Sequence, residues 1–208
     1  MNRISKRVLD IGVSTVALIV VSPLLVYGSY KIKKEDNGPV LFKQKRSGLN
    51  EETFEMYKFR SMKVNNEVVG THSNNDPYEN WNGRVPDAFV FKSAIGHNPN
   101  VTNIGAFIRK YSVDELPQII NVLKGDMSIV GPRPEIIQIT QHYDAKQKRR
   151  LEVKPGITGW AQVNGRSDVN HGKKIEYDLW YIENENFWLD IKILWMTFMQ
   201  VVRGKGSV

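Results

Sequence analysis

The chain of 208 residues contains no cysteine, which excludes disulfides, thiolate metal sites and a thiol nucleophile. Its few histidines lie in polar stretches without the spacing of zinc ligands: His72, His97, His142 and His171. No zinc-finger, basic-zipper or aromatic RNA-binding signature accompanies the net charge of +7, so we expect no nucleic-acid partner. The charge calls instead for anionic lipid or a phosphorylated substrate.

Long hydrophobic runs are also scarce, and the chain has one. It is uncharged from Ile11 to Tyr30, with basic clusters at residues 3–7 and 31–34. No small-residue cleavage site follows it, so we interpret it as a retained membrane segment and not as a signal peptide. The sequence therefore predicts a membrane segment over residues 1–34 and one folded domain over 35–208.

Ser22 and Pro23 interrupt this run near its middle. Twenty helical residues reach about 30 Å, barely the thickness of the hydrocarbon core. Pro23 would leave the Ile19 carbonyl without its helical partner, and the Ser22 hydroxyl is available to satisfy that carbonyl. Because each arm covers only about 15 Å, we expect a helix broken at Ser22-Pro23 into a re-entrant hairpin that returns to the same face. A single kinked span is the alternative.

The stretch from Lys110 to Pro134 carries the main candidate chemistry. Its start fits a capping box with Ser112 as N-cap and Glu115 three residues later. A short apolar helix should follow and stop near Gly125. Asp114 and Glu115 would then lie at a helix N-terminus, where the dipole keeps a carboxylate ionised and suits phosphate chemistry.

Two glycine- and proline-rich motifs follow. Gly131, Pro132, Arg133 and Pro134 form a stiff turn that presents one guanidinium in a fixed direction, suited to bidentate binding of phosphate. The run from Lys154 to Arg166 reads KPGITGWAQVNGR, and its glycines suit close backbone approach to a ligand.

With the Asp-Glu pair and the Ser-Pro bend, these motifs resemble the monotopic phosphoglycosyl transferases, the bacterial sugar transferase family, over nearly the whole chain. The resemblance implies a mixed α/β fold, mostly helical, with a re-entrant membrane hairpin and interfacial amphipathic helices. It implies transfer of a sugar 1-phosphate from a UDP-sugar to polyprenyl (undecaprenyl) phosphate with release of UMP, the first membrane step in making a surface glycan such as an exopolysaccharide or capsule. The enzyme would lie on the cytoplasmic face of the bacterial inner membrane, as a minimal catalytic form.

The resemblance also implies residue roles. Asp114 would be the nucleophile, Glu115 would act as a base or orient the acceptor, and Asp114 with Asp178 would hold Mg²⁺. Substrate-binding residues would be Lys58, Arg60, Arg109, Gly131, Pro132, Arg133, Pro134, Gln162, Asn164 and Arg166.

The remaining segments carry weaker signals. Residues 40–44 and 53–59 are β-prone, and residues 63–100 are predicted to form a mobile loop or lid. We expect a basic, solvated helix over 136–153 and a second helix over 173–184. The apolar helix over 187–203 should lie in the membrane interface, a core helix being the alternative.

Two other functions stay open: a membrane-anchored basic scaffold or nucleic-acid-binding protein without catalysis, and a one-step transferase of the polytopic kind. The donor sugar, the glycan and a possible homodimer are not determined by the sequence.

Overall fold

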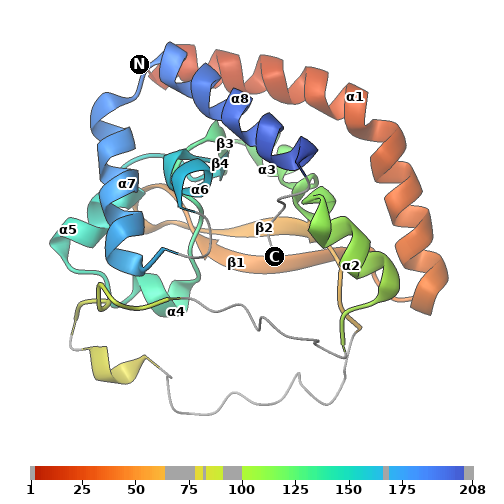
Figure 1. Ribbon diagram of the computed structural model, residues 1–208, viewed down its shortest axis with the longest axis horizontal. Coiled ribbons are helices and arrows are strands. Elements are labelled where there is room, and N and C mark those ends of the chain that lie inside the picture. The colour runs from red at the N-terminus through yellow and green to blue at the C-terminus, as the bar shows by residue number, and fades with distance from the viewer. Residues whose placement is uncertain (1–2, 64–77, 82, 91–99, 166–168, 204–208) are drawn as a thin grey trace.

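The computed structural model describes residues 3–63, 78–81, 83–90, 100–165 and 169–203. These residues form a mixed α/β fold that is mostly helical, with two small sheets in its middle (Figure 1). The α-helices and strands are α1 (Arg3–Asp36), β1 (Leu41–Ser47), β2 (Thr53–Phe59), α2 (Asn103–Lys110), α3 (Gln118–Lys124), β3 (Ser128–Val130), α4 (Ile137–Thr140), α5 (Ala145–Lys148), β4 (Gly156–Thr158), α6 (Trp160–Asn164), α7 (His171–Asn184) and α8 (Phe187–Val202).

Helix α1 is continuous across Pro23 and arches over the other elements (Figure 1). The Ser22 hydroxyl donates to the Ile19 carbonyl at 2.8 Å, the carbonyl that Pro23 deprives of its helical donor. The predicted bond is confirmed. The predicted break at Ser22-Pro23 is not observed. Because the Ile19 carbonyl is satisfied, the helix bends there and continues. Among the described residues, α1 is the one helix long and apolar enough to cross a membrane by length and composition.

The beginning of α1 is held to the domain by polar contacts. Lys6 forms an ion pair with Asp190 of α8 at 2.7 Å, and the Arg7 guanidinium donates to the carbonyls of Val122 and Leu123 at the end of α3. Both side chains belong to the basic cluster at residues 3–7, and the net charge favoured an anionic lipid or a phosphorylated substrate as partner. In the structure both bind protein groups instead. Arg7 does so because α3 ends with unsatisfied carbonyls that a cation can bind.

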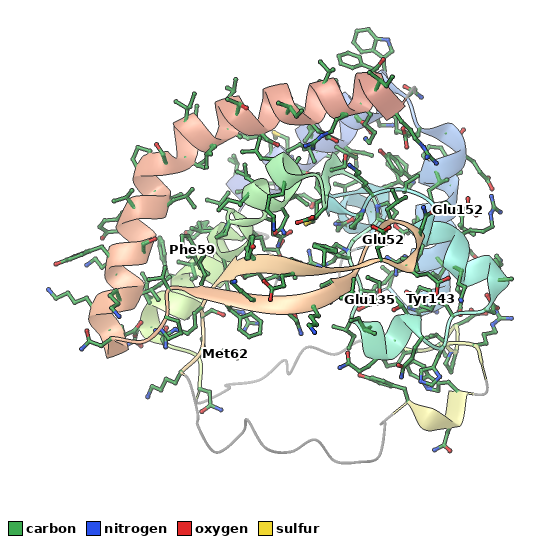
Figure 2. All side chains as sticks on the ribbon, turned by 180° about the vertical axis from the view of Figure 1, so that it is seen from behind. Glu52, Phe59, Met62, Glu135, Tyr143 and Glu152 are labelled. Atoms are coloured by element: carbon green, nitrogen blue, oxygen red, sulfur yellow. The ribbon has the colours of Figure 1, made fainter. Side chains whose placement is uncertain are left out.

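The end of α1 packs against the same domain. Ile32 is buried in a cluster with Phe59, Ile108 and Val113, and Figure 2 shows Phe59 beside this part of the helix. The Glu35 carboxylate also accepts from the Asn103 amide at 2.9 Å. Both ends of α1 therefore contact one domain, while its middle exposes apolar side chains.

The two β-prone runs form strands β1 and β2, which pair as an antiparallel hairpin with Leu41 opposite Phe59 and Ser47 opposite Thr53. Helix α3 is fastened to the edge of β2 by Asn121, which is fully buried. Its amide oxygen accepts from the Tyr57 amide at 3.0 Å, and its amide nitrogen donates to the Glu55 carbonyl at 2.7 Å. The hairpin thus fixes the helix that follows the Asp-Glu pair.

Strands β3 and β4 run parallel, pairing Ser128 with Gly156 and Val130 with Thr158. A Cβ atom at Gly156 or Gly159 would collide with the backbone of Gly131. These two glycines therefore allow two protein backbones to approach each other closely. We had expected them to allow close approach to a ligand.

The C-terminal helices α7 and α8 pack on this core. Ile175 and Leu179 of α7 are buried as expected, and α8 buries Leu189 and Ile193 while exposing a second apolar face. Residues 136–153 do not form one helix but divide into α4, α5 and a 3₁₀ turn, Arg149–Leu151. A capping box formed by Asp144 and Gln147 begins α5 after the interruption.

The stretch predicted to be a lid is described only in part. Val85 is fully buried beside Tyr78, Trp81 and Phe89, and its backbone exchanges two hydrogen bonds with the Gln147 amide. These described residues are packed against the domain because their aromatic rings bury apolar surface. Most of the remaining stretch lies outside the described residues, so the lid stays a prediction.

Candidate functional site

The Asp-Glu pair lies in a 3₁₀ turn, Val113–Glu115, just before α3. Ser112 has a left-handed backbone (φ 55°) and makes no side-chain cap, so the predicted capping box is wrong. The Glu115 side chain turns away from Ser112 because two cations bind it. Both carboxylates precede the α-helix instead of occupying its first turn.

Glu115 is the centre of a buried charge cluster. Arg133 binds its carboxylate with both terminal nitrogens, at 2.5 and 3.2 Å, and the Lys58 ammonium lies 2.8 Å from Oε1. Burial alone would raise the pKa of Glu115, but Arg133 and Lys58 hold it well below its usual range. Burial lowers the pKa of Lys58, and Glu115 partly offsets that. A carboxylate held in this way is a poor proton acceptor near neutral pH.

Asp114 has the opposite environment. Burial and the neighbouring Glu115 charge raise the pKa of Asp114 to about 6, although Lys58, Arg133 and Arg109 oppose the shift. One carboxylate oxygen, Oδ1, is buried without a hydrogen-bond partner among the described residues. The helix N-terminus therefore does not lower the pKa of Asp114 as expected, although a carboxylate with a pKa of about 6 is still mostly ionised at neutral pH. An incompletely satisfied carboxylate is suited to bind a cation or attack an electrophile.

The turn Gly131–Pro134 is held through its backbone. The Gly131 amide donates to Thr158 at 2.8 Å, and the Pro132 carbonyl accepts from Gly156 at 2.8 Å. Two guanidinium groups bind the next two carbonyls: Arg150 donates to Arg133 at 2.9 Å and Arg46 donates to Pro134 at 3.2 Å. The Arg133 side chain consequently leaves a fixed backbone in the direction of Glu115.

Asp178 is 1% exposed and lies 2.7 Å from Arg150 Nη2. Burial raises the pKa of Asp178 to about 6 against the opposing effect of Arg150. Arg150 also donates to the Tyr143 hydroxyl at 2.6 Å, and Glu135 approaches the same guanidinium at 4.0 Å. Glu135 and Tyr143 are labelled in Figure 2.

The other predicted site residues are dispersed. Arg109, near the end of α2, is close enough to act on Asp114 electrostatically. The Arg60 guanidinium lies against Gly38, and Gln162 contacts the Ile157 carbonyl at 3.5 Å. Asn164 is exposed and bonds to Trp160 within its own helix. Arg166 lies outside the described residues.

The magnesium prediction can be compared with the donor groups present. No group of three or more His, Asp or Glu side chains suited to a metal occurs among the described residues. The unpartnered Asp114 oxygen fits Mg²⁺ as a single protein ligand, because Mg²⁺ commonly takes one or two carboxylates together with substrate phosphates and water. Asp178 fits less well, because its Oδ2 lies 2.7 Å from the buried Arg150 guanidinium, whose charge repels a cation.

Sequence reasoning missed Arg46 and Arg150. Arg150 was taken as part of a solvated basic face, yet its side chain is only 4% exposed. No local signal separates it from its exposed neighbours Lys148 and Arg149, because the burial comes from α7 and the Gly131–Pro134 turn.

Comparison with known proteins places this geometry in a family. The profile of the family described as bacterial sugar transferase matches residues 1–204. The chain is 42% identical over 207 residues to the undecaprenyl-phosphate galactose phosphotransferase of Salmonella typhimurium, covering 99% of this chain and 42% of that protein. It is 40% identical over 217 residues to the UDP-glucose:undecaprenyl-phosphate glucose-1-phosphate transferase of Escherichia coli, covering 100% of this chain and 42% of that protein.

A relative of similar length is the uncharacterized sugar transferase EpsL of Bacillus subtilis. It is 40% identical over 203 residues, which are 98% of this chain and 90% of EpsL. The chain thus spans less than half of the two named phosphotransferases but most of EpsL.

Proposed function

Because the chain belongs to the bacterial sugar transferase family, we propose that it transfers a sugar 1-phosphate from a UDP-sugar to polyprenyl phosphate. Two relatives about 40% identical are named as undecaprenyl-phosphate sugar phosphotransferases, one of them with UDP-glucose as donor. The observation that carries the proposal is the pair of unlike carboxylates: Asp114 with a raised pKa and a free oxygen, beside Glu115 bound by two cations.

In the proposed first step, an Asp114 carboxylate oxygen attacks the phosphorus that bears the sugar. A P–O bond forms, the bond between that phosphorus and the bridging oxygen breaks, and UMP leaves with the electron pair. In the second step an oxygen of polyprenyl phosphate attacks the same phosphorus and displaces the Asp114 carboxylate. The products are UMP and polyprenyl diphosphate sugar, so the protein regains its starting state.

The surrounding cations stabilise charge and position the groups. In-line phosphoryl transfer depends on placement and charge neutralisation more than on proton transfer. Lys58 and Arg133 are held by Glu115, so their orientation is fixed before a phosphate enters. Glu115 therefore acts by orienting these cations, in preference to the alternative role of general base.

Mg²⁺ is part of the proposal, with Asp114 Oδ1 as its protein ligand. When bound it would neutralise phosphate charge, and the low number of protein donors leaves room for substrate oxygens. Asp114 would then hold both the metal and the diphosphate near the attacking oxygen.

We also propose that α1 is re-entrant and that the domain lies on one face of the membrane. Both ends of α1 bind the same domain, through Arg7 and Lys6 at one end and Ile32 at the other. A straight span would put these ends on opposite sides of a hydrocarbon core about 30 Å thick. UDP-sugars are cytoplasmic, so the cytoplasmic face is the one that fits.

Helix α8 extends the proposed membrane surface. It is joined to the start of α1 by the Lys6–Asp190 ion pair, and Figure 1 shows it on the same side of the molecule as α1. Its outer face exposes Trp188, Ile191, Trp195, Phe198 and Val202. Tryptophan is favoured at membrane interfaces because its ring is apolar and its N–H is polar.

The test is the mass of the intact protein after mixing with UDP-glucose and Mg²⁺ in the absence of polyprenyl phosphate. It should rise by one sugar phosphate, and polyprenyl phosphate should return it to the starting value. Asp114→Asn should show neither the adduct nor release of UMP. An adduct that persists in this variant would rule out Asp114 as the nucleophile.

A further inference from the structure

Arg150 lies where three separate segments meet. Its Nη1 donates to Tyr143, after α4, and its Nη2 lies 2.7 Å from Asp178 of α7. The same Nη2 donates to the Arg133 carbonyl at 2.9 Å. With the guanidinium and the carboxylate both almost fully buried, water cannot replace any of these partners without opening the domain.

The turn that Arg150 holds has few other supports. Pro132 and Pro134 have no amide hydrogen, so two of its residues cannot donate a backbone bond. Among the described residues, the Arg133 carbonyl accepts a hydrogen bond from the Arg150 guanidinium, and the Pro134 carbonyl accepts one from Arg46. The direction of the Arg133 side chain, and hence its bidentate bond to Glu115, therefore depends on where Arg150 is placed.

We propose that Asp178 is a positioning residue that acts through Arg150 on the Arg133 turn, and that it is not a magnesium ligand. The inference rests on the proposed function, because it assigns Asp178 a place in that reaction. Asp178 balances the Arg150 charge and fixes the guanidinium plane. The guanidinium then holds the Arg133 carbonyl, and Arg133 holds Glu115 and presents its charge to phosphate.

This role separates Asp178 from Asp114 chemically. Asp114 Oδ1 and Asp178 Oδ2 are both buried without a hydrogen-bond partner among the described residues, but Asp178 Oδ2 lies 2.7 Å from the Arg150 guanidinium as an ion pair. A cation bound by Asp178 would lie beside the buried Arg150 guanidinium, and the repulsion between the two positive charges would be poorly screened there. The two carboxylates should therefore respond differently to substitution when metal binding is measured directly.

The first experiment measures metal binding without turnover. Mn²⁺ is titrated into the detergent-solubilised full chain in the presence of UMP, and free Mn²⁺ is read by electron paramagnetic resonance. Asp178→Asn should bind Mn²⁺ as the parent does, within about twofold. Asp114→Asn should bind it at least about tenfold more weakly. Equal weakening in both variants would overturn the positioning role.

A second variant covers the case in which Asp178→Asn does not fold. The double substitution Arg150→Met and Asp178→Leu removes both charges together and leaves apolar groups, which a buried site tolerates better than one unpaired charge. It too should bind Mn²⁺ like the parent protein and lose turnover. Loss of Mn²⁺ binding in this folded variant would make Asp178 a metal ligand.

The second experiment measures UMP release over a range of Mg²⁺ concentrations. Asp178→Asn should lower kcat by on the order of 10- to 100-fold while the half-saturating Mg²⁺ concentration stays within about twofold. Arg150→Lys should lower kcat similarly, and adding Asp178→Asn to it should lower kcat by no more than about twofold further. Losses that multiply, or recovery of Asp178→Asn at high Mg²⁺, would overturn the inference.

Asp190→Asn is the matched control. Asp190 has the same 1% exposure as Asp178 and the same 2.7 Å ion-pair distance, to Lys6, but it contacts neither Arg133 nor Arg150 in the described ion pairs. It should lower the melting temperature without lowering kcat of the folded fraction. If the parent releases no UMP at all, the proposed function fails. If the parent is active and binds no Mn²⁺, only the magnesium assignment fails, and the kinetic comparison of Arg150 and Asp178 still decides the positioning role.

Discussion

Asp10 accepts two hydrogen bonds from the start of β3, from the Ser128 hydroxyl at 2.9 Å and from the Ile129 amide at 3.0 Å. Asp10 belongs to the long apolar helix α1, whereas β3 leads directly into the Gly131–Pro134 turn. Arg7, one turn earlier, binds the end of α3, which follows the Asp-Glu pair. Helix α1 therefore holds the end of α3 and the start of β3, two elements that lie between the Asp-Glu pair and the Gly131–Pro134 turn.

Replacing Asp10 by leucine should destabilise the protein by about 1–3 kcal/mol, because the buried Ile129 amide loses its acceptor. Asp10→Asn retains an acceptor oxygen and should cost less. The measurement is thermal unfolding of the solubilised protein, with Thr15→Ala on the exposed side of α1 as the control. An unchanged melting temperature in Asp10→Leu would contradict the proposed coupling.

The dependence of kcat/KM on pH should report Asp114. Only the ionised carboxylate can attack, and the pKa of Asp114 is raised to about 6, so the rate should fall as the pH drops below about 6. In Glu115→Gln the neighbouring negative charge is lost and the pKa of Asp114 should decrease. The acidic limb should then move to lower pH, even though the rate is lower. A limb that moves upward would point to another group.

Asp114→Asn should be more stable than the parent at pH 8. The pKa of Asp114 is raised from 3.8 to about 6, so ionisation above pH 6 disfavours the folded state, by on the order of 1–3 kcal/mol. Below about pH 3 the carboxyl is mostly neutral in both the folded and unfolded states, and the difference should become small. Denaturant unfolding at pH 8 and pH 3 checks this, with the exposed Glu51→Gln as the control.

Both ends of α1 should be inaccessible from outside the cell. Cysteines introduced at the exposed positions Ser5 and Lys34 are the sole thiols of the chain. An impermeant maleimide should label neither in intact cells and both after permeabilisation, because both ends contact the domain that we propose to lie on the cytoplasmic face. Labelling of one of them in intact cells would disprove the re-entrant arrangement.

The outer face of α8 should lie in the headgroup region. Trp188 and Trp195 are 76% and 63% exposed, so their fluorescence should be quenched by brominated lipids in reconstituted vesicles. Replacing both by phenylalanine should remove most of the quenching, whereas Trp81→Phe, in the packed cluster around Val85, should retain it. Equal quenching in both variants would place α8 away from the lipid.

Features that depend on residues close together in the sequence could be predicted from the sequence. The Ser22 bond to Ile19 spans three residues, and the end of α3 at Gly125 follows from the left-handed backbone that glycine adopts there (φ 98°). The two β-prone runs that form β1 and β2, the helix α7 and the family motifs also followed from local pattern. In each case the interacting groups are close along the chain, so their meeting does not depend on the rest of the fold.

Only the tertiary structure decided the state of the site. Glu115 does not form the expected capping box with Ser112. Its carboxylate instead binds Lys58, 57 residues away, and Arg133, 18 residues away. Arg150 is buried because α7 brings Asp178 against it, although it stands in a run of solvated bases. The pKa of Asp114 likewise depends on burial by distant segments. Residue types and motifs determined which groups are present, whereas desolvation and long-range pairing determined which of them are charged, bound or left with a free oxygen.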